Sequence, residues 1–215
     1  FSPFKNPFSL LEQKKYKQSF YKYSMMNSKV IINQKLTSKD FSSKTIPSQD
    51  FENQHFQNCN FTSTILSSIK FIDCQFTNCN FSNSQLSNTR FQNASFQCCK
   101  ILGLDFTKTD QFLLSLSFKE CLISSCNFSN LKIPKTEFKK CKLTDSYFTG
   151  ADLTNSNFQE SNLQGTQFHE TNLEKANFQA AINYHIDPRT NKIKGAKFSM
   201  PEAAGLLTSF EIILN

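Results

Sequence analysis

Residues 136–180 read TEFKK CKLTD SYFTG ADLTN SNFQE SNLQG TQFHE TNLEK ANFQA. Each block of five opens with a small residue (Thr, Cys, Ser or Ala). Each block also carries Phe or Leu at its third position, which we call the centre. A short fixed period that continues without a gap is typical of a solenoid.

A period of five matches neither a helix, with apolar residues three and four apart, nor a strand, with alternation every two. Five residues can instead form one side of a square coil, so that four blocks complete a turn. Successive turns then lie at the strand spacing of about 4.8 Å, with the centre and the small residue two before it pointing inward. We therefore expect Phe138, Phe158 and Phe178 to stack in one column.

The blocks ADLTN, SNLQG, TNLEK and ANFQA match the A(D/N)LXX motif, and the chain resembles the pentapeptide-repeat family in them. This resemblance implies an all-β solenoid that folds as a right-handed quadrilateral β-helix.

Centres recur every five residues over most of the chain. The repeat is predicted over residues 46–182, with two extra residues that break it near 107–116. Residues 183–215 are interpreted as an excursion (Asn183–Lys192), a last coil around Phe198, and a capping or dimerisation module. In that module we expect a short helix from Pro201 to about Ser209, because Pro is tolerated in a first helical turn, and then a strand over Phe210–Leu214.

Residues 1–45 carry an excess of lysine and are predicted to form a basic N-terminal cap or arm. As an arm, the segment would touch nucleic acid or an acidic surface. As a cap, it would cover the first coil with a helix around Ser9–Tyr23 and a strand around Lys29–Leu36. A targeting segment or a poorly ordered arm also stays open, although the lysine-rich start lacks the apolar core of a secretory signal.

Seven of the eight cysteines lie two residues before a centre, and only Cys98 does not. In this inward position Cys acts as a small apolar filler. Cys59, Cys79 and Cys99 open every fourth block in succession, so we expect them to form a ladder. CxxC pairs and His partners are missing from the sequence, which argues against a metal or another cofactor and favours free thiols in a reducing compartment.

Residues 186–207, IDPRTNKIKGAKFSMPEAAGLL, look like the C-terminal module of Qnr-type pentapeptide-repeat proteins. That resemblance implies a two-fold homodimer and binding to DNA gyrase or topoisomerase IV by mimicry of DNA, with protection from quinolones or peptide toxins in some members. The residues that we assign to dimerisation are Pro201, Leu206, Leu207, Phe210, Ile212, Ile213 and Leu214.

Charge along the repeat is uneven, although acidic and basic residues nearly balance over 46–182. Residues 118–142 hold six lysines against Glu120 and Glu137, whereas residues 143–182 hold five carboxylates against Lys175. A DNA mimic should be acidic, so we assign partner binding to this acidic band. A merely solvated surface is the alternative. The band consists of Asp145, Asp152, Glu160, Glu170 and Glu174.

Catalysis has little support. His55 and His169 lie at outward repeat positions and His185 in the excursion, and a filled rod lacks the concave pocket of an enzyme. No run of 18 apolar residues suggests a membrane helix. We therefore expect a cytoplasmic non-enzyme without a small-molecule substrate. The alternatives are a scaffold whose partner is unrelated to DNA topology and a protein whose N-terminal arm binds nucleic acid. The long loops of the Qnr proteins that protect best from quinolones are not found, so drug protection is not expected.

Overall fold

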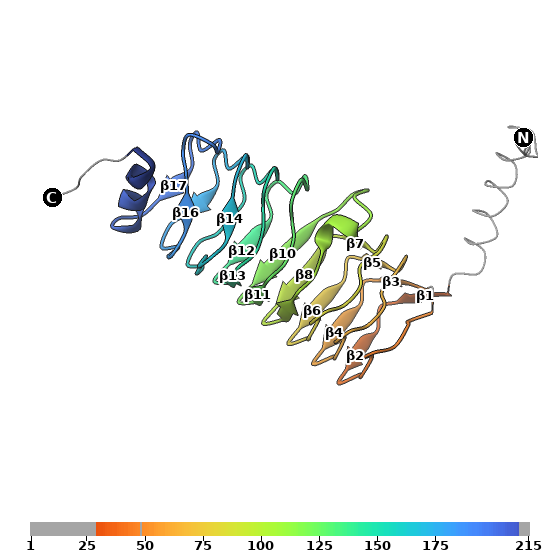
Figure 1. Cartoon of the computed structure of the whole chain (residues 1–215). Coiled ribbons are helices and arrows are strands. Elements are labelled where there is room, and N and C mark those ends of the chain that lie inside the picture. The colour runs from red at the N-terminus through yellow and green to blue at the C-terminus, as the bar shows by residue number, and fades with distance from the viewer. Residues whose placement is uncertain (1–28, 48, 211–215) are drawn as a thin grey trace, which may run out of the picture.

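The computed structural model describes residues 29–47 and 49–210, which wind into one elongated parallel β-solenoid (Figure 1). The coils follow one another in a row from β1 to β17. Each coil has four short sides, and we name the four faces of the rod A to D in the order in which the chain runs along them. In one coil the centres are Phe51 on face A, Phe56 on face B, Phe61 on face C and Leu66 on face D.

All strand pairs are parallel. Face A carries β1 (Lys29–Ile32), β3 (Gln49–Glu52), β5 (Lys70–Ile72) and β7 (Arg90–Gln92). Face B carries β2 (Lys35–Thr37), β4 (His55–Gln57), β6 (Gln75–Thr77), β8 (Ala94–Gln97), β10 (Leu116–Lys119), β12 (Glu137–Lys139), β15 (Asn177–Phe178) and β17 (Lys197–Phe198). Face C carries β9 (Lys100–Leu102), β11 (Leu122–Ser124) and β13 (Lys142–Thr144). Face D carries the 3-10 helix η1 (Phe106–Lys108), β14 (Gln167–Phe168) and β16 (His185–Ile186).

The predicted column of aromatic rings is confirmed. Phe158 stacks on Phe138 at 5.0 Å and on Phe178 at 4.8 Å between ring centroids, with the ring planes nearly parallel. Beyond η1 the Phe columns occupy faces B and D, and their rings meet edge to face inside the rod, as between Phe148 and Phe158 at 6.1 Å between centroids. Such ring pairs contribute about 0.5–1.5 kcal/mol each beyond the burial of their surface.

Each corner depends on the residue two positions after a centre. At most of these corners φ lies between 51° and 72°, in the left-handed region that Gly and Asn tolerate best. One such residue in every five turns the chain by one side, and this is the physical origin of the five-residue period. The corner after Phe106 is instead formed by the 3-10 helix η1. Gly165 shows how tight a corner can be, since an added Cβ would clash with the Asp145 Oδ1 atom.

The first two positions of the motif have separate hydrogen-bonding roles. The small inward side chain donates a hydrogen bond to the backbone carbonyl of a centre in the preceding coil. Thr171 Oγ1 on face A, for example, donates to the carbonyl oxygen of Phe148 on face D at 2.9 Å. The Asp or Asn before a centre accepts from the backbone N–H two residues on, as Asp152 Oδ1 does from Thr154 at 3.0 Å. This is the Asx-turn geometry that favours Asp and Asn at such positions.

The two extra residues lie between Asp110 and Leu116. Before them, partners on successive coils are separated by four blocks, as Arg90 and Asp110 are. Across them the separation grows by two, as between Phe96 and Phe118. The insertion forms a small loop whose Phe112 and Leu113 side chains are exposed.

The coil begins earlier than the sequence reading placed it. Ile31, Leu36 and Phe41 are centres that lie one coil before Phe51, Phe56 and Phe61, so the expected boundary near residue 45 is one coil too late. The expected strand over Lys29–Leu36 is two strands joined by a corner at Asn33, where φ is 53°. We missed this coil because Gln34 and Lys39 occupy its inward small position; both are exposed here, since no described coil lies before them. The expected helix over Ser9–Tyr23 lies outside the described residues.

Residues 183–192 are less of an excursion than predicted. The stretch from Ile182 to His185 has two residues fewer than its counterpart one coil earlier, and the stretch from His185 to Lys192 has two more. As a result Ile186 lies buried above Phe168. The last coil regains its phase, because Phe198 stacks on Phe178 at 5.2 Å.

The C-terminal helix is η2 (Glu202–Phe210), a 3-10 helix. The prediction that Phe210 begins a strand is therefore wrong, because Phe210 is the last residue of this helix. The rest of the expected strand lies outside the described residues. Within residues 29–47 and 49–210, no helix has the length and apolar character needed to cross a membrane.

The stacked column gives a direct test of what holds the rod together. We expect Phe158→Ala to destabilise the protein by about 3–5 kcal/mol, because it empties a fully buried position between two stacked rings. Phe158→Leu should cost less, since Leu fills the same position on faces A and C. Urea unfolding followed by circular dichroism measures both. Equal losses for the two variants would contradict the packing argument.

The cysteines give a second test. All eight thiols are free, and only Cys98 is exposed. Burial raises the pKa of Cys74 to about 12 and that of Cys126 to about 11, which makes these thiols unreactive. Titration of the native protein with a thiol reagent should label one cysteine, and eight after denaturation. The native reaction needs alkaline pH, because desolvation and the Glu120 carboxylate raise the pKa of Cys98. Fewer than eight in the denatured, unreduced protein would reveal disulfides.

Candidate functional site

The acidic band forms a ring around the rod and not a patch on one face. Asp152 and Glu174 flank centres on face A, and Glu170 forms the corner between faces D and A. Asp145 lies at the corner between faces C and D, and Glu160 at the corner between faces B and C. The structure therefore brings only the first three to neighbouring parts of the surface.

Several of these carboxylates already have partners within the chain. Asp152 is held by both the backbone and the hydroxyl of Thr154. Glu160 lies 3.4 Å from the Lys140 Nζ atom. Glu170 lies 3.9 Å from the ring of its neighbour His169. Exposed ion pairs of this kind contribute little to stability and exchange readily for other partners.

Lysines gather at the corner between faces B and C, which we call the B–C edge. Lys119 and Lys139 lie on face B, Lys140 forms the corner, and Lys100 and Lys142 lie on face C. Counting along the sequence revealed the basic stretch but could not place it on one edge, because neighbouring blocks face different directions.

Face A of the N-terminal half carries a charge ladder that sequence reasoning missed. Lys70 donates to Asp50 at 2.6 Å, and Arg90 Nε donates to Asp110 at 2.9 Å. Asp110 is partly desolvated, yet hydrogen bonds from the backbone of Phe112 and from the Arg90 side chain hold its pKa below the usual value. The Arg90 guanidinium also lies over the Phe112 ring at 4.9 Å. The recurrence of these four charged residues at every fourth block was the signal that could have revealed the ladder.

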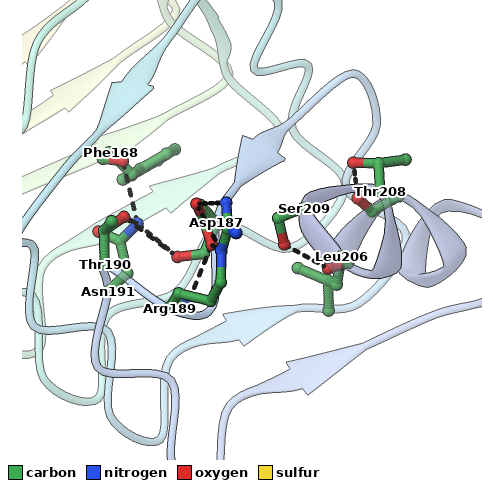
Figure 2. A network of polar contacts seen from close by, with 9 residues as sticks. Phe168, Asp187, Arg189, Thr190, Asn191, Leu206, Thr208 and Ser209 are labelled. Carbon is green, nitrogen blue, oxygen red and sulfur yellow. Dashed lines mark hydrogen bonds and ion pairs between the residues drawn. The ribbon is translucent and has the colours of Figure 1, made fainter. Parts of the chain in front are cut away.

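The C-terminal module closes the last coil with a polar network (Figure 2). Asn191 Nδ2 donates to the Phe168 carbonyl at 3.0 Å, and its Oδ1 accepts from the Thr171 backbone at 3.0 Å. Arg189 folds back on Asp187, and its side-chain and backbone hydrogen bonds lower the pKa of that carboxyl to about 2.

The predicted dimerisation residues divide into two groups around η2. Leu206 packs partly against the core, whereas Pro201, Leu207 and Phe210 are exposed. Ile212, Ile213 and Leu214 lie outside the described residues. The module thus presents an apolar surface at the end of the rod, next to the acidic ring.

His55 lies near the N-terminal end of the described rod, whereas His169 and His185 lie on successive coils of face D. His55 bonds to the Thr77 hydroxyl at 3.1 Å, while His169 and His185 are exposed on face D. In the described part of the chain, no three His, Cys, Asp or Glu side chains gather as a metal site. A surface depression of about 270 Å³ near Asn83 and Lys108 is lined by polar and aliphatic residues, with no His or Cys among them.

Comparison with known proteins agrees with this architecture. A family model described as pentapeptide repeat region matches residues 49–125 and 112–178. No curated protein matches the sequence significantly. Trypsin-treated QnrB1, described as a plasmid-mediated fluoroquinolone resistance protein, superposes with a TM-score of 0.62 at 19% identity, covering 85% of this chain and 100% of that one.

HetL, a protein involved in heterocyst differentiation regulation in the cyanobacterium Nostoc sp. strain PCC 7120, superposes with a TM-score of 0.55 at 12% identity. That match covers 83% of this chain and 91% of HetL. At these identities the structural likenesses show the fold alone. The repeat match extends over more than half of the sequence, and the chain belongs to the pentapeptide-repeat family.

Proposed function

We propose that this protein is a non-catalytic rod that binds type II topoisomerase, DNA gyrase or topoisomerase IV, and modulates the enzyme by mimicking DNA. The acidic ring carries this proposal. Residues 143–182 form two coils, or about 10 Å of rod, with a net charge of −4 from five carboxylates and Lys175. A DNA duplex of that length carries about six phosphate charges, so the charge densities are comparable.

The distribution of the ring also favours mimicry. A duplex is negative on all sides, and Asp145, Glu160 and Glu170 lie at three different corners of the rod. The QnrB1 likeness over its whole length supports a related use of the fold, since that protein is a quinolone resistance factor. We place the action in the cytoplasm, where the eight free thiols would stay reduced.

Dimerisation through the C-terminal module completes the proposal. A two-fold axis near η2 would bring two acidic rings together at the centre of a longer rod. The exposed Leu207 and Phe210 side chains are the apolar surface that such contact would cover.

A second candidate function is a scaffold for a partner unrelated to DNA topology. The formal charge of the whole chain is +7, so the protein outside residues 143–182 is basic. HetL, a protein involved in heterocyst differentiation regulation, has the same fold. Under this reading the rod would bind a protein partner and leave topoisomerase activity unchanged.

A supercoiling assay with purified gyrase separates the two candidates. The full chain should inhibit supercoiling, and inhibition should weaken as salt rises from about 50 to 200 mM because the contact is electrostatic. Glu170→Lys/Glu174→Lys should raise the inhibitory concentration at least about tenfold, or 1.4 kcal/mol. The control Glu52→Lys/Glu137→Lys makes the same charge change outside the ring. No inhibition by the unmodified chain at low salt would exclude the topoisomerase proposal, and equal loss in the control would remove the ring from it.

The dimer is tested by light scattering after size exclusion. One chain has a mass of 24.7 kDa, so the unmodified protein should elute with twice that mass. Leu207→Glu/Phe210→Glu should give the monomer, because two buried charges would oppose association. Leu122→Glu, at an apolar position of similar exposure on face C, should leave the dimer intact. A monomeric unmodified protein would refute C-terminal dimerisation.

A further inference from the structure

The B–C edge places lysines directly above one another. Lys119 and Lys139 are in-register partners on face B, one coil apart. On face C, Lys100 and Lys142 are two coils apart in one column, with Leu122 between them. Strand neighbours lie about 4.8 Å apart, so Lys119 and Lys139 are an unfavourable pair of like charges unless an anion lies between them.

Little in the described part of the chain neutralises this edge. Lys140 makes an ion pair with Glu160 at 3.4 Å, and no other ion pair involves these five lysines. Glu120 lies in the same corner column, between Cys98 and Lys140, and accepts a hydrogen bond from the Cys98 thiol. The edge therefore keeps a net positive charge of three when Glu120 and Glu160 are counted against its five lysines.

Lys140 itself occupies a position that the fold would fill better with another residue. Its φ is 54°, in the left-handed region that costs a side chain such as Lys roughly 1 kcal/mol relative to Gly. The same corner column has Ser38, Asn58, Asn78, Cys98 and Glu120 in earlier coils. A charged residue kept at a strained position in place of Asn suggests use of the charge, because strain persists where function requires it.

We propose that the B–C edge, formed by Lys100, Lys119, Lys139, Lys140 and Lys142, binds the phosphate backbone of duplex DNA. Lysine is a point-charge donor suited to phosphate. Protein–protein interfaces are depleted in lysine and depend on aromatic and arginine anchors. Among the described side chains on this edge, the exposed large apolar residue is Leu122, which is not aromatic. The exposed Tyr147 lies on face D and not on this edge. Bases of single strands need aromatic platforms, so the chemistry favours the duplex backbone.

This site is distinct from the proposed topoisomerase contact, and the two meet at the ion pair between Lys140 and Glu160. The B–C edge belongs to residues 100–142, whereas the acidic ring belongs to residues 143–182. Binding to DNA can therefore be measured without any enzyme, and the failure of one proposal does not decide the other.

The test is fluorescence anisotropy of a short labelled DNA duplex with the full chain. The edge variant is Lys119→Gln/Lys139→Gln/Lys140→Asn. The matched control is Lys132→Gln/Lys135→Asn/Lys194→Gln, with two lysines on face A and one at the corner between faces A and B, where Lys135 also has positive φ. Both variants remove three charges, retain the same N-terminal lysines and relieve one strained corner, so both should be at least as heat-stable as the unmodified protein.

We expect the edge variant to weaken binding by about tenfold or more and to lower the slope of log K against log salt by roughly two to three, since each lost phosphate contact removes about 0.9. The control should bind like the unmodified chain. Equal weakening in the two variants, or no binding by the unmodified chain at low salt, would overturn the site. Binding of the edge to polyglutamate but not to DNA would assign it to an acidic protein and overturn the nucleic-acid proposal.

Discussion

Backbone hydrogen bonds between successive coils decide which side chains become neighbours in this protein. Because the coils pair in register, each residue lies on the one four blocks further along, and the rod becomes a set of vertical columns. Inward columns are filled by Phe, Leu and small residues, and each outward column gathers whatever the sequence repeats at that phase. Like residues therefore meet like residues: rings stack in the core, thiols line up beside them, and lysines accumulate on one edge.

Most of the architecture could be predicted, because a column needs only a period, and the period is visible in the sequence. The first described coil was missed for a local reason: Gln34 and Lys39 stand where the motif has small residues, and both side chains are exposed there. The shortened side after Ile182 was missed because the two residues it lacks return at the next corner. Neither departure changes the count over a whole coil.

The candidate site was harder to predict, since a charge count carries no direction. Asp145 and Asp152 are close in sequence, yet one forms a corner between faces C and D and the other holds an Asx turn on face A. The insertion before Leu116 also shifts every later column by two residues. Only the three-dimensional phase separates the ring of carboxylates from the edge of lysines, and it places two opposite polarities on adjoining coils of one rod.

The corners show that the two halves of the rod are under different demands. From Asn33 to Gly103 the left-handed positions hold mostly Asn and Ser, with Asp73 as the charged one. From Glu120 to Lys175 most of them are charged, at a cost in local strain. The corners of the N-terminal half thus hold residues that tolerate positive φ well. The corners of the C-terminal half hold charged residues that tolerate it less well, so that backbone strain is higher there.

The stacking of each coil on its neighbour has a kinetic consequence as well. Hydrogen-bonded partners across coils are only 19–25 residues apart in sequence. For a chain of 215 residues this separation is about a tenth of the length, a relative contact order typical of helical bundles and well below that of β-sandwiches. A nucleus of two coils could form anywhere and grow by adding one side at a time, so this all-β rod should assemble without the slow search for distant strands that delays most β proteins.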